Sequence, residues 1–221
     1  MESQHGTLKS SLLMVFWGTS ATTLASWGAT LLVLLYANVQ GTESTAELIS
    51  IVGVQMLNIV MIMTSVGTLL GYVGLRKVGP DFGKALAAMI VGLFASAAGG
   101  FFTEHLGAAG EVLSLLIARP ASLAVIYFVV LGVGRYLQGA GCPGFAEQAG
   151  RVFRWYLALW AVSLVFQLLA VVPALGRGTA AAVVSAVSST AGLAASVIYL
   201  AFLYRAIRAV KQEMGDQLPS R

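Results

Sequence analysis

The chain has 221 residues, of which 58% are hydrophobic and only 10% are charged. A soluble globular domain carries about 25% charged residues, so this composition excludes an ordinary water-soluble fold. Mean hydropathy is +0.85, and the apolar residues form long runs rather than alternating or helical periodicities. The net charge of +4 does not indicate nucleic-acid binding, because the Lys and Arg residues lie in short connections between these runs. We expect an all-α, multi-pass integral membrane protein whose main partner is the lipid bilayer.

The first half of the chain predicts three membrane-spanning helices. Apolar runs cover residues 12–36, 48–75 and 85–102, and a helix needs about 20 apolar residues to cross a hydrocarbon core of about 30 Å. The first run is longer than the apolar region of a cleaved signal peptide, which has about 7–15 residues, so we interpret it as a span that is retained. Gly79 and Pro80 with their charged neighbours predict a tight turn before the third span.

The fourth span has two interpretations, because Arg119 and Pro120 interrupt its apolar run. In the first, one long helix from Glu111 to Leu137 kinks at Pro120 and carries Arg119 into the membrane. In the second, residues 111–118 form a separate helix flat on the outer surface, and Pro120 opens a span over residues 120–137. Proline suits the first turn of a helix, and an unpartnered arginine in the membrane costs at least about 2.5 kcal/mol. The second interpretation is therefore preferred.

The second half of the chain adds two further spans and a polar tail. The apolar runs cover residues 153–172 and 180–204, and residues 205–221 are polar. Ahead of the fifth span, Glu147 and Arg151 stand four residues apart and predict an exposed helical ion pair. The whole chain, residues 1–221, is thus expected to form one transmembrane domain, a bundle of six helices.

Charge placement predicts the orientation of this bundle. If the N-terminus is cytoplasmic, only Arg119 and Arg177 of the 13 Lys and Arg residues fall on the outer side. Short cytoplasmic loops are enriched in Lys and Arg. Five or seven spans would place the cationic tail outside, so six is the consistent number. We expect a protein of the cell (inner) membrane with both termini in the cytoplasm.

Small residues recur every four positions along several predicted spans. Such rows let helix backbones approach closely in lipid, where hydrophobic association between helices is weak. The residues assigned to helix packing are Gly67, Gly71, Gly92, Ser96, Gly100 and Gly192. Packing within one chain is favoured, and a homo-oligomer or another membrane protein remains the alternative partner.

The spans offer little that could support catalysis. Away from their inner ends, the five well-defined spans contain no Asp, Glu, Lys, Arg or His. Proton relays and intramembrane ion sites place ionisable groups at membrane depth, and intramembrane proteases need paired acids or a Ser–His pair there. His5 and His105 both fall outside the spans. We expect no enzyme, no metal site and no cofactor.

Polar side chains at membrane depth are the remaining candidates for a functional site. They are Gln55, Asn58, Gln167, Thr22, Ser26 and Ser163. In the preferred hypothesis they form hydrogen bonds between helices, each worth about 0.6–2 kcal/mol, and the protein is a scaffold or accessory subunit. In the alternative they line the path of a small permease or channel for a polar solute. Amides that converge on a cavity would favour the permease, whereas amides paired in a dry bundle would favour the scaffold.

Overall fold

The computed structural model describes the backbone of residues 2–38, 43–171 and 178–216. Side chains are described for residues 4–28, 53, 55–57, 59–99, 101–107, 109–110, 112–170 and 183–212. Four positions singled out in the sequence therefore lie outside the described side chains, namely Asn58, Gly100, Glu111 and Arg177.

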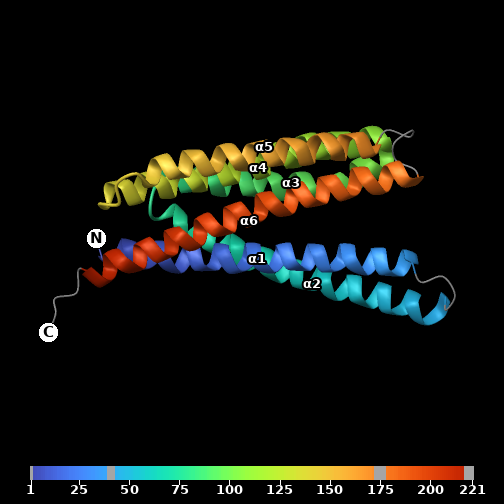
Figure 1. The fold of residues 1–221 in the computed structure, drawn as a ribbon, viewed down its shortest axis with the longest axis horizontal. Helices are drawn as coiled ribbons and strands as arrows, with labels where there is room; N and C mark the ends of the chain where they lie inside the picture. The colour runs from blue at the N-terminus through green and yellow to red at the C-terminus, as the bar shows by residue number, and fades with distance from the viewer. Residues whose placement is uncertain (1, 39–42, 172–177, 217–221) are drawn as a thin grey trace.

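The described chain is helical throughout, apart from short turns (Figure 1). The helices are α1 (Glu2–Asn38), α2 (Glu43–Arg76), α3 (Pro80–Leu106), α4 (Ala108–Gly139), α5 (Phe145–Val171) and α6 (Gly178–Asp216). They lie along one long axis, and both termini are at the same end of the molecule (Figure 1). We call this the terminus end, and the opposite end, where α1 stops and α6 starts, the distal end.

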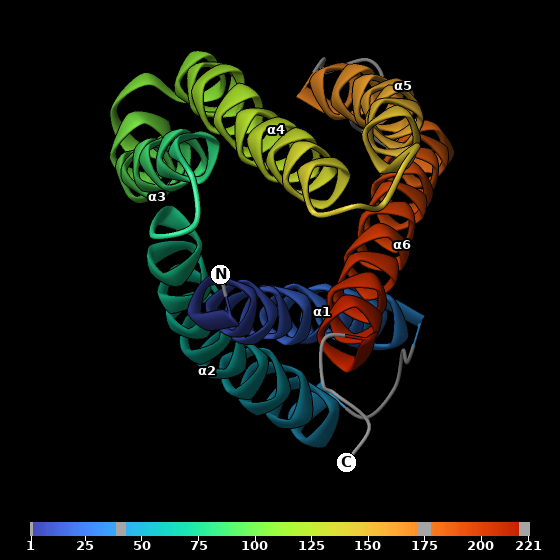
Figure 2. The same cartoon turned by 90° about the vertical axis from the view of Figure 1, so that its left-hand side faces the viewer.

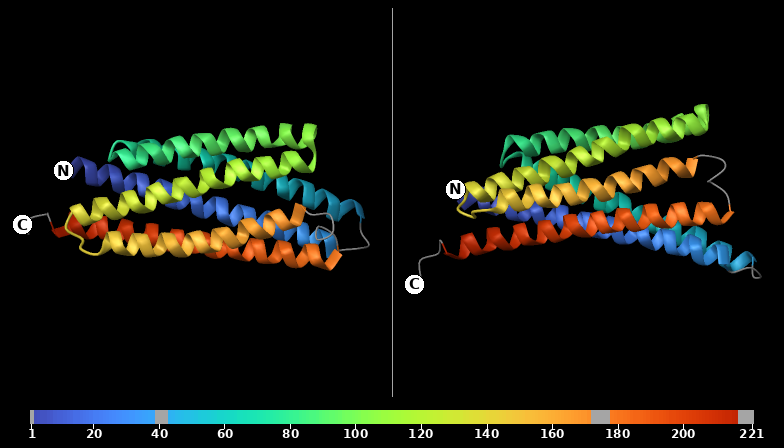
Figure 3. Two further views of the ribbon diagram at one scale, coloured as in Figure 1. Left: turned by 90° about the horizontal axis from the view of Figure 1, so that it is seen from above. Right: turned by 45° about the horizontal axis from the view of Figure 1, so that its top comes forward.

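Successive helices pack as antiparallel pairs, α1 with α2, α3 with α4 and α5 with α6. Viewed along the long axis, the three pairs form a ring that α6 closes by packing against α1 (Figure 2). Helices α1 and α2 cross the other four obliquely, as both views of Figure 3 show. They separate from the rest of the bundle toward the distal end (Figure 1).

Five of these helices are long and apolar enough to cross a membrane. The candidate spans are Gln55–Arg76, Pro80–Gly99, Val112–Gly139, Phe145–Ala170 and Val183–Gln212. Their outer faces carry large apolar side chains, and Phe94 is 73% exposed and Met63 70% exposed. Contact with lipid hydrocarbon is favourable for such surfaces, whereas contact with water is unfavourable. The structure thus agrees with a helical membrane protein. The span expected over residues 12–36 runs beyond the described side chains of α1.

Large buried side chains concentrate toward the terminus end. The core there contains Leu8, Leu12, Val15, Tyr72, Leu75, Phe82, Val129, Val130, Val133, Leu137, Tyr199, Phe202, Leu203 and Val210. Toward the distal end the buried side chains are mostly small, such as Ala25, Ala95, Ser163, Ser188 and Ala191. Among the described residues, the large buried side chains thus fill the terminus half of the bundle, and mostly small ones are buried in the distal half.

The first residues of the chain belong to this core rather than to a polar head. Helix α1 begins at Glu2, and the side chain of Leu8 is completely buried. His5 is 6% exposed, and its ring lies edge-on to Tyr136 of α4, with 5.6 Å between ring centroids. Packing against the other helices thus extends α1 beyond the apolar run that predicted it.

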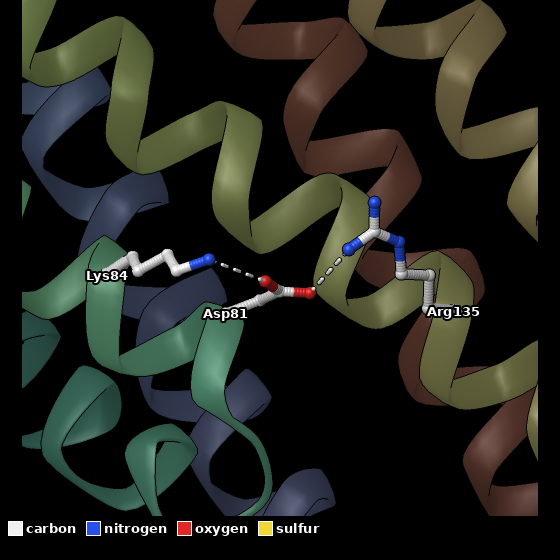
Figure 4. Close-up of polar contacts among 3 residues, drawn as sticks. All are labelled: Asp81, Lys84 and Arg135. Carbon is white, nitrogen blue, oxygen red and sulfur yellow. Dashed lines mark hydrogen bonds and ion pairs between the residues drawn. The ribbon is translucent and has the colours of Figure 1, made fainter.

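Asp81 links the start of α3 to the end of α4 through ion pairs at the terminus end (Figure 4). Its carboxylate accepts a hydrogen bond from Arg135 Nη1 of α4 at 3.0 Å and lies 3.7 Å from Lys84 Nζ of α3. Pro80 occupies the first turn of α3, directly after the turn that the sequence predicted before this span. The predicted pair of Glu147 and Arg151 is also confirmed, at 3.0 Å on the surface of α5.

Helix α4 differs from the preferred interpretation of the sequence. It runs without a break from Ala108 through Pro120 to Gly139, so a separate outer helix over residues 111–118 is wrong. The reason is packing against α3, because Gly110 lies against the backbone of Phe102 and Gly99 lies against Ser114. The first turns of α4 are thereby held upright beside α3. Proline is tolerated inside membrane helices when neighbouring groups compensate, and Ser122 Oγ donates to the Arg119 carbonyl at 2.8 Å.

Candidate functional site

A polar cavity of about 320 Å³ lies between α1, α4, α5 and α6 in the distal half of the bundle. We call it the hydroxyl cavity. Its lining comprises Thr22, Thr23, Ser26, Trp27, Arg119, Ser163, Gln167, Ser188, Ser189, Gly192, Leu193 and Ser196. Seven of these twelve residues carry a hydroxyl group. The cavity is thus far more polar than the surfaces that the same helices present to lipid.

A second cavity of about 320 Å³ adjoins the first. It is lined by Leu115, Arg119, Phe166, Gln167, Ala170, Val184, Ser185, Ser188 and Ser189, and we call it the side cavity. Arg119, Gln167, Ser188 and Ser189 line both. These four residues therefore stand where the two cavities meet, and a molecule in either one would touch them.

The wall between α5 and α6 is built from serines that bond to each other. Ser163 Oγ donates to the Ser188 carbonyl at 3.1 Å, and Ser188 Oγ donates to the Ser163 carbonyl at 3.1 Å. Gly192 lies one turn further along α6, where an added Cβ would be 3.6 Å from Ser163 Oγ. Small side chains let the two backbones approach closely. The hydroxyl groups of α6 consequently lie along the side of this helix that packs against α5.

The wall from α1 is tied to α2 by threonines. Thr22 Oγ1 lies 2.9 Å from the Gly18 carbonyl and 2.9 Å from Thr64 Oγ1 of α2. Thr23 Oγ1 donates to the Thr19 carbonyl at 2.8 Å. A hydroxyl that donates its proton to the preceding turn of its own helix presents oxygen lone pairs outward. This wall therefore offers hydrogen-bond acceptors to the cavity.

Gln167 contributes a further acceptor. Its Nε2 donates to Ser163 Oγ at 3.5 Å. Its Oε1 is buried and has no hydrogen-bond partner among the described residues. A buried acceptor without a partner costs about 1–3 kcal/mol. Because this oxygen has almost no accessible surface, a molecule in the cavity would reach it only after the Gln167 side chain turned.

Arg119 is the one charged residue that lines either cavity in the part of the chain that the structure describes. Its side chain is half-buried. It stands about seven residues, or about 10 Å, inside the apolar span Val112–Gly139. The phenol of Tyr156 on α5 lies close enough for an electrostatic interaction. A cation at this depth is costly unless water, a counterion or a ligand meets it.

A third cavity, of about 270 Å³, is mainly apolar. Helices α2, α3 and α4 supply most of its lining, which comprises Thr68, Tyr72, Ala88, Met89, Gly92, Leu93, Ser96, Ala118, Ser122, Val125, Ile126 and Tyr156. It offers few polar groups that could hold a ligand. Groups that could hold a polar ligand are therefore more frequent in the other two cavities, which α1, α4, α5 and α6 line.

The structure separates the polar residues that the sequence had grouped together. Thr22, Ser26, Ser163 and Gln167 all line the hydroxyl cavity. Gln55 is exposed on α2 and lines none of the three cavities. Asn58 lies outside the described side chains, and α2 does not pack against α5 within the described residues.

The small residues assigned to packing have different surroundings. A Cβ on Gly71 would lie 3.1 Å from the backbone nitrogen of Val15 in α1, and one on Gly92 would lie 3.4 Å from Ala121 Cβ in α4. Gly67 has no atom within 4 Å of such a Cβ. Ser96 borders the apolar cavity.

Sequence reasoning missed Arg119 as a site residue and, along α6, singled out only Gly192, as a packing residue. Arg119 was placed outside the membrane because Pro120 was expected to start the span. The serine pattern was visible, since Ser185, Ser188, Ser189, Gly192 and Ser196 recur at helical spacing. Its opposing wall on α1 could not be found without knowing that α1 and α6 are neighbours.

No protein-family model, curated protein or solved structure matches this chain. The function must therefore be inferred from the geometry of the cavities.

Proposed function

We propose that the chain is a six-span inner-membrane protein with cytoplasmic termini, and that it works without catalysis as a small carrier or channel for a polar solute. The hydroxyl cavity is the observation that carries this proposal. Lipid-facing surfaces of membrane proteins do not need hydroxyl groups, whereas transport paths are built from hydrogen-bonding groups that replace the water around a solute.

The distribution of packing supports a transport path over a pure scaffold. Large side chains fill the terminus end, whereas the hydroxyl cavity and the side cavity lie toward the distal end. A polar site whose path is closed on one side by large side chains is the arrangement expected of one state of a carrier that alternates its access. With the termini in the cytoplasm, the distal end faces outward.

The cavity gives support to the second of the two hypotheses drawn from the sequence. Of the three amides, Gln167 lines it beside hydroxyls from α1 and α6, whereas Gln55 is exposed on α2 and Asn58 lies outside the described side chains. The support for a carrier therefore comes from the clustered hydroxyl groups and not from convergent amides.

Reconstitution into liposomes tests the proposal. Vesicles containing the full-length protein are expected to swell faster in glycerol, urea or lactate than vesicles without protein. Gly192→Leu should abolish this difference, because its side chain would project into the cavity next to Ser163. Ala201→Leu on the exposed face of α6 is the matched control and should swell like the wild type.

If none of the three solutes enters faster than in protein-free vesicles, the transport proposal is wrong. It is also wrong if Gly192→Leu folds and swells the vesicles like the wild type.

A second candidate function, association with a copy of itself or another membrane protein, has one specific observation in its favour. Gly67 makes no contact within 4 Å of a built Cβ, although its neighbour Gly71 lies against α1. The exposed side chains around it, Ile62, Met63, Val66 and Leu70, form a flat apolar face on α2. Chemical cross-linking in native membranes would test it, because Gly67→Ile should remove a cross-linked dimer while the Ala201→Leu control keeps it.

A further inference from the structure

We infer that Arg119 is the anchor for an oxyanion, a carboxylate or phosphate group, that binds where the hydroxyl cavity and the side cavity meet. This inference rests on the proposed function and names the chemistry of its ligand. The same oxyanion chemistry is offered by a small organic acid from solution and by the headgroup of an anionic lipid.

The position of Arg119 is the first argument. Intramembrane cations are rare, face the interior of a bundle or a water-filled cavity, and mark solute or ion paths. Arg119 fits this description, because it lines two cavities about 10 Å inside the span of α4. A planar guanidinium presents its donors as a fork that matches a carboxylate or phosphate in two parallel hydrogen bonds.

The lack of an internal counterion is the second argument. In the ion pairs among the described residues, the acidic partners are Asp81 and Glu147, and both lie at the terminus end. Glu104 is exposed in the last turn of α3, and Glu111 precedes Arg119 by two helical turns, about 12 Å. Glu43 and Glu47 begin α2, which does not pack against α4 within the described residues. Among the described side chains, no carboxylate thus pairs with Arg119, and its charge is open to an oxyanion ligand.

The acceptors around Arg119 define the rest of the ligand. Thr23 Oγ1 donates its proton to the Thr19 carbonyl and lines the same cavity as Arg119, where it can accept a hydrogen bond. A ligand that places an oxyanion on Arg119 and a hydroxyl or ammonium group on this threonine would satisfy both. A volume of about 320 Å³ lies at the low end of known ligand sites, which favours a small molecule or a headgroup.

Thermal unfolding of the detergent-purified full-length protein tests this assignment. Acetate, lactate and inorganic phosphate are the probes, lactamide is the neutral match for lactate, and sodium chloride at equal ionic strength is the salt control. A ligand that binds only the folded state raises Tm in a saturable way. We expect at least one oxyanion to do so and lactamide to have a smaller effect.

Two substitutions of Arg119 separate charge from folding. Arg119→Gln should lose the oxyanion-dependent rise in Tm while its unliganded form stays folded, because it removes a cation from membrane depth. Arg119→Lys should keep a weaker response, since lysine supplies the charge without the fork. Gln167→Glu should also lose the response, because a carboxylate in the shared lining would pair with Arg119 and take the place of the ligand.

The lipid composition of the purified proteins distinguishes the two sources of the oxyanion. If the group is a lipid headgroup, mass spectrometry should find anionic lipid retained by the wild type and lost from Arg119→Gln. If it is a free solute, the retained lipids should be the same in both variants and only the soluble probes should separate them.

The inference is wrong if neither the three soluble oxyanions nor the retained lipids distinguish wild type from Arg119→Gln. Vesicle swelling in glycerol and urea then shows whether the wider proposal survives. Swelling that stays sensitive to Gly192→Leu but not to Arg119→Gln would keep the transport function and discard the anion site. If vesicles with Gly192→Leu and with Arg119→Gln both swell like the wild type, both the transport function and the anion site are discarded.

Discussion

Ser163 and Ser188 exchange hydrogen bonds across the interface of α5 and α6, each hydroxyl donating to the other residue's backbone carbonyl at 3.1 Å. The two hydroxyl oxygens are 3.2 Å apart, and both side chains are only 6% exposed. This reciprocal pair holds two helices together at the α5–α6 wall of the hydroxyl cavity. The same residues therefore stabilise the helix packing and make the cavity polar.

We expect Ser163→Ala and Ser188→Ala to be coupled in a double-mutant cycle. Interhelical hydrogen bonds in membranes contribute about 0.6 kcal/mol on average and at most about 1.7 kcal/mol. The free energy of unfolding in mixed micelles should show a coupling in this range. Ser196→Ala is the control, because the Ser196 hydroxyl bonds within its own helix to the Gly192 carbonyl. Additive effects of the two serine substitutions would contradict the reciprocal pair.

Gly71 and Gly67 should respond oppositely to the same substitution. A Cβ at Gly71 would lie 3.0 Å from the Ser11 carbonyl oxygen and 3.1 Å from the Val15 nitrogen, both backbone atoms of α1. Gly71→Ala should therefore push α1 and α2 apart and destabilise the protein by about 1–3 kcal/mol. Gly67 has open space at that position, so Gly67→Ala should be neutral or stabilising by up to about 1 kcal/mol. Tm followed by tryptophan fluorescence would measure both.

The upright position of the first half of α4 predicts where its side chains can be reached. In a Cys142→Ser background, Leu116→Cys should resist water-soluble maleimides and should bring an attached fluorophore within reach of nitroxide lipids at hydrocarbon depth. Leu116 is 50% exposed on the surface of the bundle, so lipid is its expected surrounding. Fast aqueous labelling of this position would favour a segment lying flat on the surface.

Orientation can be tested at the two ends of the bundle in the same background. Gln212→Cys near the end of α6 should react with an impermeant reagent only from the cytoplasmic side, and Leu106→Cys at the distal end of α3 only from outside. Both residues are exposed. Labelling of the two positions from one side would contradict the proposed topology, since the three spans proposed between them, α4, α5 and α6, place them on opposite sides.

Asp81 should contribute little to stability in spite of its two cationic neighbours. Lys84 and Arg135 have side chains that are 62% and 66% exposed, and ion pairs between exposed groups contribute less than about 1 kcal/mol. Asp81→Asn should lower the free energy of unfolding by no more than this, and the difference should shrink at high salt. A larger, salt-independent loss would show that Asp81 has another role at the start of α3.

The sequence by itself determined which solvent the chain needs and where most helices lie. Lipid solubility follows from the sum of side-chain transfer energies along a run, which needs no knowledge of neighbours. For this reason the runs 48–75, 85–102, 153–172 and 180–204 all fall within helices α2, α3, α5 and α6, with the last residue of the 153–172 run outside the described part.

Tertiary structure decided what these helices do together. Pro120 looked like a boundary because local propensity was the only information available, and packing of Gly99 and Gly110 against α4 and α3 overrode it. That packing carries Arg119 into the bundle, and the closure of α6 against α1 brings the serines of one to the threonines of the other. A cavity is formed by the surfaces of several helices that face each other. A periodic pattern in one helix does not reveal which other helix packs against it.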